Sequence, residues 1–296
     1  MIILDAYKRF CLNVYDMSRY LIVNADDFGH TKGVSEGILR AYREGIVTST
    51  SVMINKPAAA DGLRLALGVA SDLGFGLHLT LTSGRPVLAA ESIPDLVQAS
   101  GSFHRPEELM MALAGIDLSQ VERELRAQVE LFIQIAGRAP DHLDSHHHIT
   151  YKSPVLLSVM LQLAQELDMP IRNPFQRNDD QAEAAMGEKQ AVIRSEDMLR
   201  RSQVLMPDCF LEHFYAKQAT LGNLLNMLFD LPDGVCELMC HPAIVDDALR
   251  DSSTYSERRA DELAVLVHPS VRDLIEAGGI ELVSFGSLGK AKEVTT

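Results

Sequence analysis

The sequence predicts an α/β protein in which parallel strands form a closed or distorted (β/α) barrel. Short apolar runs alternate with amphipathic segments of helical periodicity along the whole chain, which is the pattern of repeated βαβ units. We count about eight such units, and we expect right-handed crossovers between parallel strands. A length of 296 residues with 47% hydrophobic residues suits one barrel. An open doubly wound sheet is the alternative that the same alternation allows.

The first half of the chain is expected to hold strands at 20–25, 48–54, 74–81 and 141–145. The first, YLIVNA, is an apolar run typical of a buried strand. The second, TSTSVMI, is rich in β-branched residues, which favour a pleated surface. The third, GFGLHLTL, precedes a polar excursion, and the fourth, DHLDS, leads into three histidines.

Helices are expected between these strands at 34–43, 57–70, 106–114 and 118–136. Val34 and Ile38 share one face of the first helix, and Gly45 ends it. Pro57 opens the second helix, because proline is tolerated in a first turn. The last helix carries an apolar stripe at every third or fourth position and ends at Gly137.

The second half continues the alternation. We expect strands at 170–173, 204–211, 235–240 and 280–285. We expect helices at 154–167, 221–229, 257–267 and 270–277. The polar segment 173–194 is expected to form an irregular loop over the site. No linker or repeat interrupts the pattern, so residues 18–296 are predicted to form a single domain, with residues 1–17 as an N-terminal extension.

Composition narrows the function and the location. A formal net charge of −14 repels phosphate backbones, which argues against nucleic acid as a partner. No apolar run approaches the roughly 20 residues that span a bilayer. Asp5, Lys8 and Arg9 stand where a signal peptide needs apolar residues, so we expect a cytoplasmic protein. The oligomeric state is left open, a homodimer included. Cys236 and Cys240 are interpreted as buried strand residues rather than metal ligands.

Carboxylates and histidines follow four of the predicted strands. Asp26 and Asp27 end the first strand, and His78 lies near the end of the third. His146 follows the fourth strand, and His241 ends the strand CELMC. Because parallel strands place their carboxyl ends at the same rim, these side chains are expected to meet there.

Asp and neutral His are ligands for divalent metals, and a three-ligand site leaves positions open for water or substrate. A metal in such a site acidifies its water and polarises a carbonyl group. One of the adjacent carboxylates could bind the ion while the other accepts a proton, although spacing alone does not separate them. His241 could protonate a leaving amine, and a nearby carboxylate would raise its pKa.

Each residue also has a simpler explanation. Asp26 and Asp27 could cap the next helix, and His78 could be a hydrogen-bonded core histidine. His241 could simply end its strand. The shared placement of these residues at one rim argues against coincidence. Ser35 lies in a G-x-S-x-G match at 33–37, but the esterase nucleophile must follow a strand directly, and Ser35 falls in a first helical turn. We interpret this match as accidental.

Five segments together resemble the motifs of one family. These are YLIVNADDFG (20–29), GIVTSTS (45–51), GLHLTLT (76–82), HLDSHHH (142–148) and ELMCHP (237–242). They resemble YdjC-like carbohydrate deacetylases, which include chitooligosaccharide and hopanoid-associated deacetylases, and the resemblance extends over residues 18–287. It implies a distorted (β/α) barrel related to polysaccharide deacetylases. It also implies one divalent ion, Mg²⁺ or Zn²⁺, and release of acetate from an N-acetylated amino sugar, in an oligosaccharide or a glycolipid head group.

Carried over by position, the resemblance implies Asp27, His78 and His146 as metal ligands. It implies Asp26 as the catalytic base and His241 as the catalytic acid. Three further residues, Tyr255, Arg259 and Glu262, are interpreted as structural support.

Two further residues are predicted to contact the substrate, Arg172 and His148. Strand alternation would turn His148 towards the site with His146 and would turn His147 away.

Two other functions compete with this hypothesis. One is a serine esterase that uses Ser35, and the other is a non-catalytic sugar-binding barrel. A missing ligand or base would favour the second of these, but every expected position is filled. Metal content separates the metal-dependent enzyme from the esterase.

Overall fold

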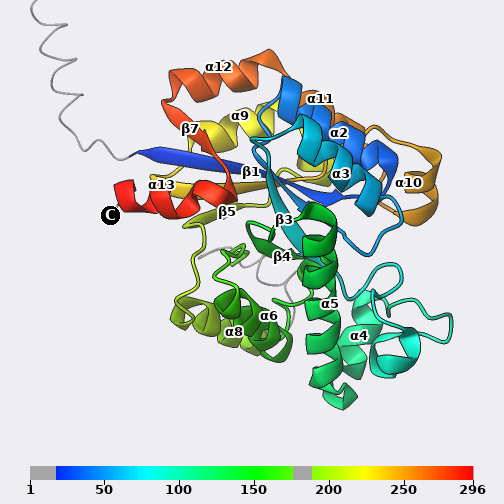
Figure 1. Cartoon of the computed structure of the whole chain (residues 1–296). Helices are drawn as coiled ribbons and strands as arrows, with labels where there is room; N and C mark the ends of the chain where they lie inside the picture. Colours follow the sequence, from blue (N-terminus) through cyan, green and yellow to red (C-terminus); the bar gives the residue numbers. More distant parts are fainter. Residues whose placement is uncertain (1–17, 176–188, 296) are drawn as a thin grey trace, which may run out of the picture.

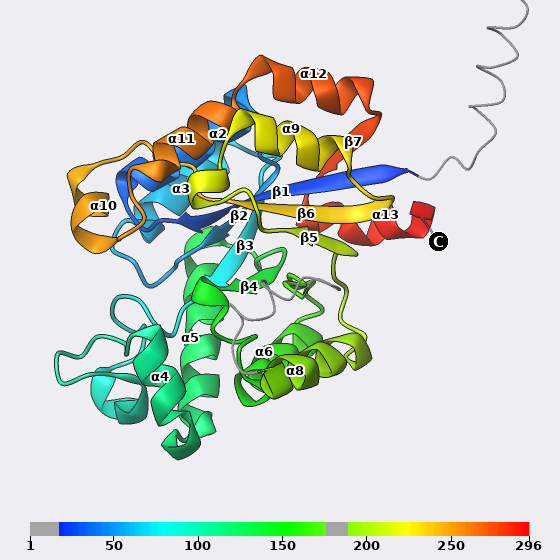
Figure 2. The same cartoon turned by 180° about the vertical axis from the view of Figure 1, so that it is seen from behind.

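The computed structural model describes residues 18–175 and 189–295. The predicted extension at 1–17 and the middle of the predicted loop at 173–194 therefore lie outside the described residues. Within them, strands and helices alternate in the predicted order, and the fold is a curled parallel sheet surrounded by helices. Figures 1 and 2 show β1 in the middle, with α2, α9, α11 and α12 on one side and α5, α6 and α8 on the other.

The strands of the described chain form one sheet. Their bounds are β1 (Arg19–Phe28), β2 (Ser49–Val52), β3 (Gly74–Leu79), β4 (Leu143–Ser145), β5 (Cys209–Leu211), β6 (Gly234–Cys240) and β7 (Ile280–Val283). Their order is β4-β3-β2-β1-β6-β5, with β7 paired to the first half of β1, and all pairs are parallel. The carboxyl ends of the strands therefore meet at one rim, as predicted.

The two edge strands, β4 and β5, are joined by loop segments instead of a direct pairing. Ile171 forms a single bridge to Leu143, and its N–H donates to the Leu205 carbonyl at 3.0 Å. The expected strands at 170–173 and 204–211 are thus reduced to one bridge and to β5. Pro170 and Pro207 explain the difference, because proline supplies no N–H for a ladder. The barrel is distorted because β4 and β5 do not pair directly with each other.

Helices fill most of the connections. Their bounds are α2 (Lys32–Glu44), α3 (Ala59–Val69), α4 (Pro106–Ala112), α5 (Leu118–Ala136), α6 (Pro154–Glu166), α8 (Lys189–Arg201), α9 (Leu221–Phe229), α10 (Asp247–Ser252), α11 (Arg258–Leu266), α12 (Pro269–Ala277) and α13 (Leu288–Thr295). The prediction of an irregular loop is wrong from residue 189, where α8 begins, because Val192, Ser195 and Leu199 bury one helical face. Sequence patterns also missed α10 and α13.

The central strand is covered on both faces. Leu21, Val23 and Ala25 of β1 belong to the main hydrophobic core. Tyr20 and Ile22 point the other way and pack in a second cluster with residues of β7 and α13. This burial explains why β1 has a continuous apolar sequence, as strands of parallel sheets do. In the described part of the chain, no helix is long and apolar enough to cross a membrane.

Candidate active site

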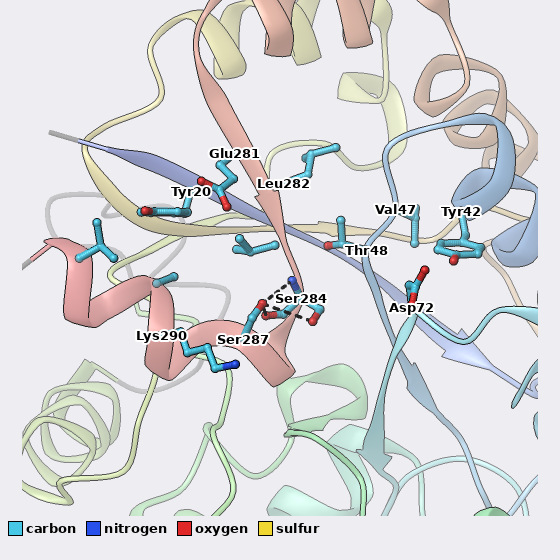
Figure 3. Close-up of a pocket in the computed structure, with 13 residues that line it drawn as sticks. Tyr20, Tyr42, Val47, Thr48, Asp72, Glu281, Leu282, Ser284, Ser287 and Lys290 are labelled. Atoms are coloured by element: carbon cyan, nitrogen blue, oxygen red, sulfur yellow. Dashed lines mark hydrogen bonds between the residues drawn. The ribbon is translucent and has the colours of Figure 1, made fainter. Parts of the chain in front are cut away.

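Two pockets lie at opposite ends of the strands. One, of about 560 Å³, lies where strands begin and is lined by Tyr20, Thr48, Glu281 and Ser284, among others (Figure 3). None of the predicted site residues lines it. The other, of about 1240 Å³, lies at the carboxyl ends of the strands. Its lining includes six predicted residues, namely Asp26, Asp27, His78, His146, His148 and His241. The structure therefore brings together the side chains that the rim argument predicted.

A left-handed turn at the end of β1 separates the two adjacent carboxylates. Asp27 has a φ of 72°, a conformation that costs a non-glycine residue about 1–3 kcal/mol. Neighbours on a regular strand would point to opposite faces. The turn instead lets both side chains reach the rim, where Asp26 contacts Arg172 and Asp27 contacts the two histidines. The turn thus directs the two neighbouring carboxylates towards different partners.

Three potential ligand atoms converge at Asp27. Its Oδ1 lies 3.0 Å from His146 Nδ1 and 3.4 Å from His78 Nε2, and the two nitrogens are 3.2 Å apart. Ligands about 2.1 Å from one ion lie about 3.0 Å apart in octahedral and about 3.4 Å apart in tetrahedral coordination. Asp27 Oδ1 is buried and has no hydrogen-bond partner among the described residues. The donor set and its spacing therefore fit a divalent cation.

His78 is oriented by a second carboxylate. Its Nδ1 lies 2.7 Å from Asp144 Oδ1, and Ser51 Oγ donates to Asp144 Oδ2 at 2.8 Å. Burial lowers the pKa of His78, but Asp144, Asp26 and Asp27 together raise it by more, to about 9. A carboxylate on one ring nitrogen directs the other towards a metal. Asp144 was not predicted as a ligand or catalytic residue, although the spacing Asp-Ser-His places it on the strand face of His146.

Arg172 lies beneath the pocket and binds Asp26 through both ends of its guanidinium. Nη1 donates to Asp26 Oδ2 and Nη2 to Asp26 Oδ1, each at 2.7 Å. Nε donates to Glu237 Oε1 at 2.8 Å, and Nη1 lies 3.2 Å from Asp144 Oδ2. Burial raises the pKa of Asp26, but Arg172, with His78 and His241, lowers it by more, so the pKa lies below its ordinary value.

The placement of Arg172 differs from the predicted substrate contact. The side chain is fully buried and does not line the pocket. Asp26, His78 and Asp144 also bring three potential ligand atoms together, but Arg172 already binds both of these carboxylates. In this second cluster, the positive charge of Arg172 therefore takes the place that a metal ion would have beside the two carboxylates.

His241 lines the same pocket as the Asp27 cluster. Its Nε2 is 4.0 Å from Asp26 Oδ2, and the ring packs against Tyr215 and Tyr255. Its backbone N–H donates to the Glu262 carboxylate. A carboxylate, Asp26, does raise the pKa of His241 as predicted, but the net pKa is lowered, so the acid form is not kept populated. Burial lowers that pKa by more than Asp26 raises it, to about 4.

The histidines that follow β4 do not continue the strand. His146–His148 form a short 3₁₀ turn in which His147 and His148 have φ of 57° and 51°. Strand alternation therefore does not apply, and the prediction that His147 points away from the site is wrong. Both side chains line the pocket, with His147 Nδ1 3.0 Å from Thr82 Oγ1. His148 Nδ1 is buried without a hydrogen-bond partner in the part of the chain that is described.

Ser35 lies outside the pocket lining. Its hydroxyl accepts a hydrogen bond from the Gly29 N–H at 3.0 Å and donates to the Thr31 carbonyl at 3.3 Å. Ser35 is buried in α2, as the interpretation of an accidental motif requires. Its contacts indicate a role in holding the turn that follows Asp27.

Replacing Ser35 by alanine is expected to reduce stability and to spare the chemistry. The loss of two buried hydrogen bonds should cost about 1–3 kcal/mol, and kcat should stay within a few-fold of wild type. Thermal unfolding and steady-state kinetics measure the two effects. A collapse of kcat in a folded variant that still binds metal would support a serine nucleophile.

Comparison with known proteins places this site in a family. Residues 20–277 match the family model described as YdjC-like protein. The chain belongs to the YdjC-like family. A YdjC-like relative named carbohydrate deacetylase, from Geobacillus stearothermophilus, is 38% identical over 270 residues, which cover 91% of this chain and 98% of the relative.

Solved structures agree with this YdjC-like fold. A crystal structure from Enterococcus faecalis is 35% identical, with a TM-score of 0.81, and the match covers 92% of this chain and 99% of that one. A peptidoglycan N-acetylglucosamine deacetylase is 11% identical, with a TM-score of 0.50 over 92% of this chain and 88% of its own. The latter similarity concerns the fold alone. The predicted distorted barrel is confirmed, and its fold is similar to that of this polysaccharide deacetylase.

Proposed function

We propose that this YdjC-like chain is a metal-dependent carbohydrate deacetylase that removes the N-acetyl group of an amino sugar and releases acetate. The observation that carries the proposal is the convergence of Asp27, His78 and His146 within 3.0–3.4 Å beside Asp26 and His241. Curated relatives at 35% and 38% identity are named carbohydrate deacetylase, which supports the substrate class.

The proposed metal ligands are Asp27 Oδ1, His78 Nε2 and His146 Nδ1. Two imidazole nitrogens and one carboxylate oxygen suit Zn²⁺ better than Mg²⁺, which prefers oxygen ligands. When bound, such an ion acidifies water and polarises the acetyl carbonyl.

Asp26 is the proposed base that accepts a proton from the attacking water. Arg172 keeps Asp26 ionised, and Asn24 donates to Asp26 Oδ1 at 2.8 Å. These contacts restrict the carboxylate to one orientation, and its lowered pKa means that it holds a proton only weakly. A proton taken by Asp26 therefore passes readily to a stronger acceptor.

His241 is the proposed stronger acceptor and the acid that completes the reaction. An amide nitrogen leaves poorly as an anion, so it must be protonated as the C–N bond breaks. His241 is neutral at neutral pH because its pKa is about 4. His241 Nε2 lies 4.0 Å from Asp26 Oδ2, so it can receive the proton from Asp26 once the two atoms move within hydrogen-bonding distance, and can then deliver it to the leaving nitrogen.

The remaining pocket residues suit a sugar. The lining combines aromatic rings, such as Tyr215 and Tyr255, with polar groups such as Arg105 and Glu107. We propose that His148, with its unpartnered Nδ1, contacts the substrate, and that Arg172 acts through Asp26 rather than on the sugar.

Acetate release tests this function directly. The purified protein would be stripped with a chelator, supplied with Zn²⁺ or Mg²⁺, and assayed against N-acetylated oligosaccharides and glycolipid head groups. Acetate should form only after metal is restored. Unchanged activity of the metal-free protein would favour the esterase alternative. Sugar binding without acetate release in the metal-loaded protein would favour a non-catalytic barrel.

A further inference from the structure

Arg259 contacts the carboxylate oxygen of Asp27 that faces away from the histidines. Its Nη2 donates to Asp27 Oδ2 at 2.6 Å, and its Nε donates to the Tyr255 carbonyl at 2.8 Å. The residue lies in the first turn of α11, lines the pocket and is 3% exposed. Its own carbonyl accepts the Ala243 N–H at 3.1 Å. Arg259 is therefore held firmly at both its backbone and its side chain.

This contact divides the oxygens of Asp27 between two partners. Oδ2 is engaged by Arg259, whereas Oδ1 faces His146 Nδ1 and His78 Nε2. A carboxylate held in this way presents Oδ1, and not Oδ2, to the two histidine nitrogens. An aspartate without that restraint can bind a cation through one oxygen or through two, and each mode leaves a different number of positions for water and substrate.

We propose that Arg259 is a positioning residue that restricts Asp27 to monodentate metal binding through Oδ1. The inference rests on the metal site of the proposed function and deepens it. By occupying Oδ2, Arg259 keeps one coordination position open that a bidentate carboxylate would fill. It also orients Oδ1 before the ion arrives, which favours binding.

A purely structural role explains Arg259 less well. Its Nη1 is buried and has no hydrogen-bond partner among the described residues, and an unmade hydrogen bond of this kind is destabilising, more so for a charged group. Arg172, in contrast, directs all three of its guanidinium nitrogens at carboxylates. A side chain selected for folding alone would be satisfied as Arg172 is. Arg259 instead leaves a charged donor at the pocket wall.

Cobalt binding tests the inference without any substrate. Wild type, Arg259→Gln and Arg259→Lys would be stripped of metal and titrated with Co²⁺, whose visible bands weaken as its coordination number rises. Arg259→Gln should raise the Kd for Co²⁺ by about 10–100-fold, as loss of an outer partner of a metal ligand does. Its bands should also weaken, because the released Asp27 binds through both oxygens. Arg259→Lys keeps the positive charge and a hydrogen-bond donor. Its Kd for Co²⁺ and its band intensity should therefore lie between those of wild type and Arg259→Gln.

Arg250→Gln is the matched control. Arg250 is an exposed arginine on α10 that pairs with Glu257 at 2.7 Å and does not line the pocket, so its variant should bind and absorb like wild type. A folded Arg259→Gln protein with the wild-type Kd and spectrum would overturn the inference. If Arg259→Gln fails to fold, the test rests on Arg259→Lys. An Arg259→Lys protein with the wild-type spectrum would then count against the inference.

The same titration separates this inference from the proposed function. If the wild-type protein binds Co²⁺ and the variants shift as expected, but acetate is never released, the deacetylase proposal fails and the role of Arg259 stands. If the wild-type protein does not bind Co²⁺, the metal site itself is wrong and both proposals fail.

Discussion

Replacing any one of the three proposed ligands should abolish metal binding and acetate release together. Asp27→Ala, His78→Ala and His146→Ala each leave two donors, and a three-ligand site does not hold a divalent ion with two. Activity should therefore fall by more than the roughly 10–100-fold that loss of an outer partner costs. Elemental analysis of the purified variants and acetate release measure the two effects.

Two further variants serve as controls for the ligand substitutions. Asp144→Asn keeps all three ligands but weakens the partner of His78 Nδ1, so we expect reduced metal affinity with residual activity. His268→Ala removes an exposed histidine that caps α12 and should retain full occupancy. Full metal occupancy in all three ligand variants would refute the assignment.

Replacing His241 by alanine should lower kcat for an N-acetylated amino sugar by about 10²–10⁴-fold, the usual contribution of a positioned acid. Metal content should not change, because the three proposed ligands remain in place. An activated acetate ester should suffer much less, because its leaving group departs without a proton. These outcomes are compared in the same metal-loaded preparations of variant and wild type.

The pH profile adds a second readout for His241. Because burial lowers its pKa to about 4, the free enzyme carries a neutral imidazole throughout the neutral range. The profile of kcat/KM reports groups of the free enzyme, so it should show no alkaline limb with the pKa of an ordinary histidine. A limb near pH 6.5 that disappears in His241→Ala would contradict the neutral resting state. Loss of metal, or an equal fall for amide and ester, would show that His241 is not the acid.

Adjacent aspartates here serve different purposes because each has its own arginine. Arg172 binds both oxygens of Asp26 from beneath the pocket, whereas Arg259 binds one oxygen of Asp27 from its wall. One carboxylate is thereby fixed and kept ionised, and the other is left with a free oxygen towards the histidines. The left-handed turn at Asp27 makes this division possible.

Local patterns in the sequence determined the elements that depend on near neighbours. The predicted helices at 118–136 and 221–229 coincide with α5 and α9, because an apolar stripe and end residues are encoded within a few turns. The shared rim was also predictable, since parallel strands must place their carboxyl ends together. Asp26, Asp27, His78, His146 and His241 all line the pocket there for that reason.

Only the tertiary structure decided what depends on distant contacts and burial. The arginine partners of Asp26 and Asp27 are 146 and 232 residues away in the chain, so no local pattern could pair them. The turn that brings His147 into the pocket breaks the strand periodicity on which its prediction relied. The pKa of His241 depends on how much water is excluded around its ring, and burial there outweighs the charge of Asp26. Periodicity specifies which face of an element is apolar, whereas ionisation and orientation depend on charges and packing contributed by other elements.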